Sequence, residues 1–212
     1  MMGLATGSIA LLLLAAAPSA IASVDANAPE SARTVLVLGD SISAAYGIQR
    51  EDGWVALLER RLKRLNPDHA VVNASVSGET TGGGLARLPG ALERHRPQIV
   101  VIELGGNDAL RGYPIATIEQ NLDRMAAAVT AAGAHPVILG MHIPPNYGPR
   151  YTGAFHALFR EVAERHGASI VPFLLDGIAT DSELMQDDGI HPTAAAQARI
   201  LDNAWSAIEA LL

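Results

Sequence analysis

Thr34-Val35-Leu36-Val37-Leu38-Gly39-Asp40-Ser41-Ile42-Ser43 is the stretch that decides how this chain folds. Its first five residues are apolar or β-branched, a run that suits a buried strand and is too short for a helix. Gly39 ends the run, and Ser41 follows where the chain must turn out of the sheet. Ligands of open α/β sheets bind beyond the carboxyl ends of the strands, so this hydroxyl can act as a nucleophile if a base reaches it. Gly, Asp and Ser are also ordinary turn residues, so the three letters alone leave a plain loop open.

Four more apolar runs follow, separated by segments with helical periodicity. We expect strands at 70–74, 99–104, 136–141 and 169–173, and helices at about 55–65, 85–94, 115–132, 155–167 and 193–211. A glycine-rich loop at 75–84 and a proline-rich loop at 143–153 are expected between them. This alternation predicts an α/β fold with a parallel sheet covered on both faces. Right-handed crossovers bring every strand-to-helix loop to one edge, so polar clusters that are distant in sequence should converge there.

Length and composition indicate one globular domain without a basic surface. A chain of 212 residues can form one sizeable α/β domain or at most two small ones. Hydrophobic residues make up 49% and charged residues 17%, which argues for a full core and against disorder. Fifteen basic against 22 acidic residues give a net charge of −7, which argues against nucleic acid as a partner. The chain contains no cysteine, so disulfides, thiolate zinc sites and cysteine nucleophiles are excluded.

The beginning of the chain has the pattern of an export signal. Residues 1–24 contain no Asp, Glu, Lys or Arg, and 9–17 form a compact apolar run. Ala20 and Ala22 fit the small-x-small site of a signal peptidase. We therefore predict a signal peptide at 1–22, a flexible leader at 23–32 and one domain at 33–212. The mature chain is then expected to be periplasmic or secreted, monomeric and without a stable membrane span. The alternative is an uncut membrane anchor, because the charge-free stretch is just long enough to span a bilayer.

The chain offers seven histidines as possible bases for Ser41, and an activated serine needs a base whose tautomer is fixed by a third group. They are His69, His95, His135, His142, His156, His166 and His191. Four of them precede expected strands, at the wrong edge of the sheet, and one lies in an expected helix; only His142 and His191 follow strands. His191 alone has a carboxylate, Asp188, three residues upstream in a tight glycine-containing loop. That spacing suits a base with its orienting acid, and it equally suits a turn in which Asp188 caps the last helix.

Acyl transfer also needs hydrogen-bond donors aimed at the developing oxyanion, and losing one typically costs about 10²–10³ in rate. The candidates are the backbone N–H groups of Ser41 and Gly78 and the side-chain amide of Asn107. Gly78 has no Cβ, so its backbone can approach a substrate closely, and it can also serve a turn with positive φ. Asn107 could instead bond its own backbone. We expect Asp40 and Asp108 to brace these loops, because a carboxylate beside the oxyanion would oppose its charge.

Four blocks of this sequence together resemble the SGNH (GDSL) hydrolases. The blocks are G-D-S at 39–41, Gly78, G-G-N-D at 105–108 and D-x-x-H at 188–191. The longer strings V-L-G-D-S-I-S-A-A-Y-G, L-G-G-N-D-A-L-R-G and M-Q-D-D-G-I-H-P are similar to the bacterial periplasmic branch of arylesterases and multifunctional acyl-CoA thioesterase/lysophospholipases. The resemblance implies a flavodoxin-like three-layer α/β/α fold with a five-stranded parallel sheet, and a reaction without metal or cofactor. The implied roles are nucleophile for Ser41, base for His191, partner of the base for Asp188, and oxyanion donors for Gly78 and Asn107 beside the Ser41 N–H.

These roles predict hydrolysis of carboxylic esters and thioesters through an acyl-enzyme on Ser41. The expected partner is a small-molecule acyl ester or thioester, such as an aryl ester, an acyl thioester or a lysophospholipid. The side chains that could line an apolar acyl groove are Leu104, Leu110, Met141, Ile143, Pro144 and Pro145. The same residues could equally form core and a stiff loop.

Three other functions stay open on the sequence. A short-chain or carbohydrate O-acetyl esterase would use the same catalytic groups. A non-catalytic flavodoxin-like binding module would hold a phosphate with Thr80, Thr81 and glycines 82–84, although a phosphate-loop lysine and a G-x-G-x-x-G are missing. A catalytically silent protein on the same fold would leave all four blocks unused.

Overall fold

The computed structural model describes residues 32–212. The predicted signal peptide, and all of the predicted leader except its last residue, lie outside these residues. No helix within 32–212 is long and apolar enough to cross a membrane.

The centre of the described chain is a sheet of five parallel strands in the order β2-β1-β3-β4-β5. The strands are β1 (Thr34–Gly39), β2 (Ala70–Asn73), β3 (Ile99–Glu103), β4 (His135–Leu139) and β5 (Ser169–Val171). In β1, Val35 pairs with Val71 of β2 on one side and with Ile99 of β3 on the other. The strand order reverses between β1 and β3, and doubly wound sheets bind their ligands beyond such a reversal.

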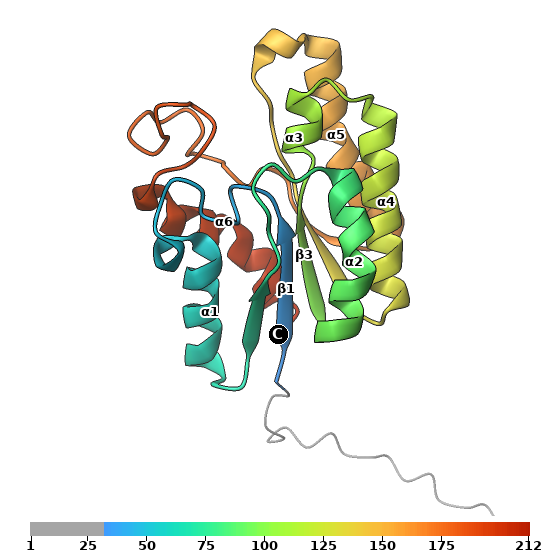
Figure 1. Ribbon diagram of the computed structural model, residues 1–212, viewed down its shortest axis with the longest axis vertical. Helices are drawn as coiled ribbons and strands as arrows, with labels where there is room; N and C mark the ends of the chain where they lie inside the picture. Colours follow the sequence, from blue (N-terminus) through green and yellow to red (C-terminus); the bar gives the residue numbers. More distant parts are fainter. Residues whose placement is uncertain (1–31) are drawn as a thin grey trace, which may run out of the picture. The chain divides into compact units, whose positions relative to one another are not determined.

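Helices cover both faces of this sheet (Figure 1). The α-helices of the described residues are α1 (Trp54–Leu65), α2 (Thr81–His95), α3 (Gly106–Leu110), α4 (Ile115–Ala131), α5 (Pro149–His166) and α6 (Gln197–Glu209). Short 3-10 turns are η1 (Arg50–Asp52), η2 (Pro145–Tyr147) and η3 (Ala194–Ala196). Helices α2, α4 and α5 pack on one face, and α1 and α6 pack on the other. This arrangement confirms the predicted three-layer α/β/α fold with a five-stranded parallel sheet.

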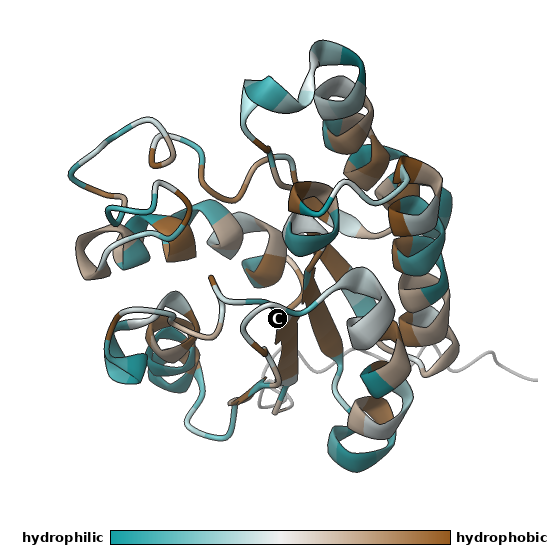
Figure 2. Cartoon of the chain, turned by 45° about the horizontal axis from the view of Figure 1, so that its top comes forward, coloured by the Kyte–Doolittle hydropathy of each residue, from teal (hydrophilic) through white to brown (hydrophobic). Residues whose placement is uncertain are grey.

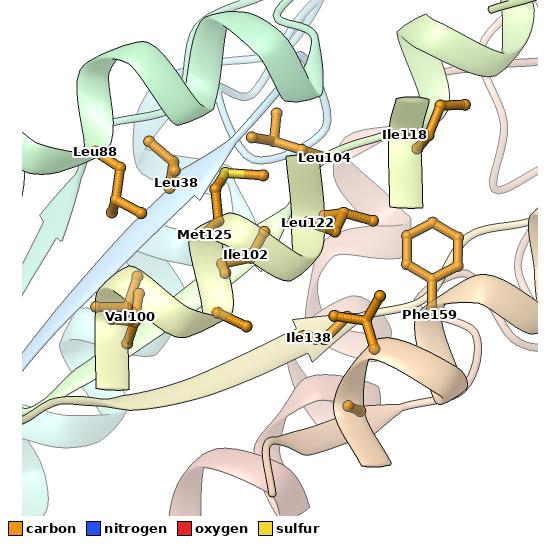
Figure 3. Close-up of a cluster of buried hydrophobic side chains, with 14 of the residues drawn as sticks. Leu38, Leu88, Val100, Ile102, Leu104, Ile118, Leu122, Met125, Ile138 and Phe159 are labelled. Atoms are coloured by element: carbon orange, nitrogen blue, oxygen red, sulfur yellow. The ribbon is translucent and has the colours of Figure 1, made fainter. Parts of the chain in front are cut away.

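The side chains of β1 alternate between two hydrophobic clusters. Leu36 and Leu38 point into the cluster under α2, α4 and α5, whereas Val35 and Val37 point into the cluster under α1 and α6. All four are fully buried, which is why this strand reads as a continuous apolar run. Figure 3 shows the first cluster, in which side chains of β1, β3 and β4 meet those of α2, α4 and α5. In Figure 2 the strands are predominantly apolar, and polar residues colour the outer sides of the helices.

The glycine-rich segment differs from the prediction. A loop was expected over 75–84, but α2 already begins at Thr81, so that glycines 82–84 lie in its first turn. Thr80 caps the helix, since its Oγ1 accepts a hydrogen bond from the N–H of Gly83 at 3.2 Å. A Cβ on Gly84 would collide with Leu104 Cδ1, so this glycine allows the helix to pack closely on the sheet. Glycine lowers helix propensity, and the cap and this packing outweigh that preference.

Two other helices also differ from the expected ranges. Helix α5 begins at Pro149, inside the loop expected at 143–153, because proline fits the first helical turn, where its missing N–H is not needed. The five-residue helix α3 was not expected, because it is too short to show a periodic pattern. It follows two residues after β3, and it carries Asn107.

Candidate active site

Ser41 lies in the turn that follows β1, at the edge of the sheet where the strands end. Only 9% of its surface is exposed, and its Oγ lies 2.9 Å from Nε2 of His191. On the other side of the imidazole, Nδ1 lies 2.6 Å from Oδ2 of Asp188. Ser41 and His191 are 150 positions apart, and they meet because the loop after β5 returns to this edge. The structure therefore joins Ser41, His191 and Asp188 in one hydrogen-bonded row.

The charge of Asp188 determines the tautomer of His191. Hydrogen bonds from the backbone N–H of His191, from its imidazole and from the backbone N–H of Ile190 lower the pKa of Asp188 to about 2. An ionised carboxylate only accepts hydrogen bonds, so Nδ1 of His191 carries the proton. Nε2 is then left as an acceptor for the hydroxyl of Ser41. An imidazole in this state can take the proton of a serine.

Asn107 reaches the same cavity as Ser41 from α3. Its Nδ2 donates a hydrogen bond to Oδ2 of Asp40 at 2.9 Å. The other oxygen of Asp40 accepts the backbone N–H of Ile42 at 3.1 Å. Because an amide nitrogen has two N–H groups, Asn107 keeps one for a bound ligand. Asp40 thus braces both the turn that carries Ser41 and the amide of Asn107, as expected.

Gly78 lies in the loop before α2 with a φ of +77°, a conformation that favours glycine. The N–H of Val76 ties this loop to β1 by donating to the carbonyl of Gly39 at 3.1 Å. Arg111, directly after α3, ties it from the other side, because its Nη2 donates to the carbonyl of Gly78 at 3.1 Å. Unlike Ser41 and Asn107, Gly78 is not among the residues that line the cavity that those two residues share.

Asp108 joins two of the segments that surround the site. Asp108 accepts hydrogen bonds from the N–H and the hydroxyl of Thr81, at 2.8 and 2.6 Å, and so joins α3 to the start of α2. This is the bracing role expected of Asp108.

Among hydrogen bonds formed within residues 32–212, neither the N–H of Ser41 nor that of Gly78 has a protein acceptor. Both donors are therefore free to bind a substrate oxygen.

A cavity of about 530 Å³ opens beside the Ser41–His191 pair. The four predicted substrate-binding residues, Leu110, Met141, Ile143 and Pro144, all line it, together with Pro145. Leu104 does not line it; of the two roles left open for this residue, the structure shows the core role. The sequence analysis missed the wall that follows β5. That wall includes Phe173, Leu174, Leu175, Ala179 and Met185.

Glu103 is the acidic residue of the site that the sequence analysis missed. It ends β3, is fully buried and contributes to the cavity wall. Its Oε2 accepts the N–H of Asp40 at 3.2 Å and the hydroxyl of Ser43 at 2.7 Å. Burial, with the charge of Asp40 adding to it, raises the pKa of Glu103 well above its usual value. The available signal was a single glutamate at the end of an apolar run.

The other histidine predicted after a strand, His142, does not reach Ser41. It lines the cavity, but its ring stacks on Phe173 at 4.0 Å and meets the ring of His156 edge-on at 3.9 Å. The His191 ring instead packs against Tyr46, with centroids 4.5 Å apart. Within residues 32–212, no group of three or more His, Asp or Glu side chains is arranged to hold a metal ion.

Comparison with known proteins identifies relatives across most of the chain. The model of the GDSL-like lipase/acylhydrolase family matches residues 37–199. Esterase TesA of Pseudomonas aeruginosa is 52% identical over 182 residues, which are 86% of this chain and 90% of that protein. Thioesterase 1/protease 1/lysophospholipase L1 of Escherichia coli strain K12 is 42% identical over 177 residues, which are 84% of this chain and 83% of that protein.

Solved structures show the same similarity in three dimensions. A crystal structure of TesA superposes with a TM-score of 0.82 at 52% identity, covering 85% of this chain and all of the other. The psychrotrophic esterase EstA from Pseudoalteromonas sp., in a structure inhibited by monoethylphosphonate, gives a TM-score of 0.80 at 43% identity. That match covers 84% of this chain and 97% of EstA.

Proposed function

Because this chain belongs to the GDSL-like lipase/acylhydrolase family, we propose that it is a serine esterase that hydrolyses carboxylic esters and thioesters through an acyl-enzyme on Ser41. The observation that carries this proposal is the hydrogen-bonded row from Ser41 through His191 to Asp188, beside a cavity of about 530 Å³. The names of the relatives, which include esterases and a thioesterase, support the same class of reaction.

The reaction proceeds in two acyl transfers. Nε2 of His191 removes the hydroxyl proton while Ser41 Oγ attacks the carbonyl carbon, and Asp188 stabilises the imidazolium that forms. The N–H groups of Ser41 and Gly78 and the amide of Asn107 hold the oxyanion. The tetrahedral intermediate then expels the alcohol or thiol, which leaves with the proton from His191. Water repeats the sequence on the acyl-enzyme, which releases the carboxylic acid and returns the proton to Ser41.

The cavity supports an apolar acyl group as part of the substrate. Its wall is built mainly from aliphatic side chains, proline and Phe173. Hydrolysis of a series of aryl esters should therefore accelerate with acyl length up to medium chains, because each buried methylene contributes about 0.8 kcal/mol. A rate that falls steadily from acetate onward would favour the alternative, a short-chain or carbohydrate O-acetyl esterase.

Export and assembly form a separate part of the proposal. The charge-free segment 1–24 supports cleavage after Ala22 and a mature protein in the periplasm or the medium. The mature chain is expected to be a monomer. N-terminal sequencing and light scattering of the exported protein test both points, and a protein that keeps Met1 and stays with the membrane would contradict them.

Labelling by a serine-directed phosphonate is the experiment that tests the proposed function. We expect one covalent adduct on the wild-type protein, mapped by peptide to Ser41, together with turnover of a generic aryl ester. The Ser41→Ala variant is the control, and it should take no label and retain less than a few per cent of turnover. A label elsewhere, or an active Ser41→Ala variant, would remove Ser41 from its role. Absent labelling together with stabilisation by flavin or nucleotide would favour the binding module.

A further inference from the structure

Two acidic side chains lie together behind Ser41, buried and without a cationic partner. Glu103 is fully buried and Asp40 is 3% exposed. The ion pairs formed within residues 32–212 include neither of them. Two neighbouring carboxyl groups in such a place cannot both ionise at moderate cost, so one of them holds a proton.

The hydrogen bonds indicate which group is protonated. Asp40 accepts from the N–H of Ile42 and from the amide of Asn107, one bond on each oxygen. Glu103 accepts both of its bonds on Oε2, and its buried Oε1 receives none from the described residues. Burial raises the pKa of Glu103 well above its usual value, whereas the pKa of Asp40, whose carboxylate accepts one hydrogen bond on each oxygen, is raised to about 6. The proton therefore belongs on Glu103, and Asp40 carries the negative charge.

We infer that Glu103 is a positioning residue for ester hydrolysis, whose carboxyl group holds the turn of Asp40 by accepting its N–H and, through the Asp40 carboxylate, positions the oxyanion-binding amide of Asn107. This inference rests on the proposed function. A neutral acid can accept the N–H of Asp40 and the hydroxyl of Ser43 without adding a second negative charge near the place where the oxyanion forms.

The surroundings of Glu103 hold its side chain in one place. The hydroxyl of Ser43 donates to Oε2, and Nε1 of Trp54 donates to the oxygen of Ser43 at 3.2 Å. Gly39 makes room for the carboxyl group, because a Cβ there would come within 2.7 Å of Oε2. The chain of contacts thus runs from α1, through Ser43 and Glu103, to Asp40 and Asn107 on α3.

Two variants test whether the hydrogen bonds of Glu103 matter or only the space that its side chain fills. Glu103→Gln keeps an acceptor oxygen and an N–H donor, so we expect kcat within about threefold of the wild type. Glu103→Leu fills the space without hydrogen bonds, so we expect kcat to fall about tenfold or more while KM changes little. A thermal melt of each variant identifies any loss that is due to unfolding.

A double-mutant cycle tests whether Glu103 acts through Asn107. In an Asn107→Ala background, Glu103→Leu should lower kcat by less than about threefold, because the group that it positions is already gone. Equal losses in both backgrounds would overturn the inference, as would a Glu103→Gln variant as inactive as Glu103→Leu. Should Glu103→Leu not fold, a loss of more than about tenfold in kcat for Glu103→Gln would still overturn the inference.

Infrared difference spectra give a readout that does not depend on activity. At pH 7, the carbonyl band of one protonated carboxyl group should be present in the spectrum of the wild type and absent from that of Glu103→Gln. Loss of carboxylate bands alone would show an ionised Glu103 and contradict the inference. An inactive wild type that takes no phosphonate would instead defeat the proposed function, so the two failures are distinguishable.

Discussion

The two sides of the candidate active site are held in different ways. On the nucleophile side, buried groups from separate strands and helices support Ser41, with hydrogen bonds that span 60 residues from Ser43 to Glu103 and 67 from Asp40 to Asn107. On the base side, Asp188 holds His191 from three positions away, and 40% of the Asp188 side chain is exposed. The base side is a local turn, whereas the nucleophile side depends on the packing of the sheet. Variants on the two sides should therefore affect activity and stability differently.

The largest effect is expected from the base side. His191→Ala and Asp188→Asn should each lower kcat by about 10⁴, because one loses the base and the other loses the group that fixes its tautomer. Asp188→Asn should lower the unfolding free energy by at most about 1 kcal/mol, since 40% of the Asp188 side chain is exposed and solvent screens the pair. Steady-state kinetics with an aryl ester and urea unfolding measure the two effects. His142→Ala, on the cavity wall, is the matched control, and a comparable loss there would challenge the choice of base.

Asn107→Ala tests the nucleophile side and should have the next largest effect. It removes a predicted oxyanion donor, so kcat should fall by about 10²–10³ with a smaller change in KM. Asn146→Ala, in the exposed turn η2, serves as the control and should behave as the wild type. An unchanged kcat for Asn107→Ala would exclude this amide from the oxyanion hole.

Stability should depend on pH with opposite signs on the two sides. Burial raises the pKa of Asp40 from 3.8 to about 6, so its contribution to stability falls as the pH rises from about 4 to about 6. Hydrogen bonds lower the pKa of Asp188 to about 2, so its contribution is lost as the pH falls from about 4 to about 2.

Asp40→Asn tests the pH dependence that comes from the buried carboxyl group. The variant should gain stability relative to the wild type at pH 8, by at most about 3 kcal/mol, and should gain less at pH 4.5. Urea unfolding at the two pH values measures it, with Asp188→Asn as the control that should show no gain at pH 8. A gain of equal size at both pH values would mean that Asp40 does not titrate in this range.

The smallest effect is expected for Arg111. Its exposed hydrogen bond to the carbonyl of Gly78 joins the loop of Gly78 to α3, and such a bond contributes on the order of 1 kcal/mol. Arg111→Met should therefore lower kcat by about fivefold without changing KM. Arg150→Met, another exposed arginine, is the control. A loss that appears only in KM would indicate that Arg111 contacts the substrate instead of the loop.

Prediction from sequence succeeded where neighbouring residues decide the structure. The buried strands read as apolar runs, and the pair of Asp188 and His191 was visible as a spacing of three residues. It failed for α3, which is too short to be periodic, and for the first turn of α2, where a cap and a close contact outweigh the low propensity of glycine. The sequence also left the role of Leu104 open, since an apolar residue after a strand can turn toward either the core or the cavity, and the structure places it in the core.

By itself, the sequence determined the parallel α/β architecture through local periodicity, and the resemblance of four short blocks to the SGNH hydrolases marked the side chains that can carry acyl transfer. Only the tertiary structure decided that Glu103 lies beside the turn of Ser41. That neighbourhood comes from the register of β1 and β3, which pairs Gly39 with Glu103. A glutamate at the end of an apolar run has an ordinary pKa until the folded protein removes its water and places Asp40 against it.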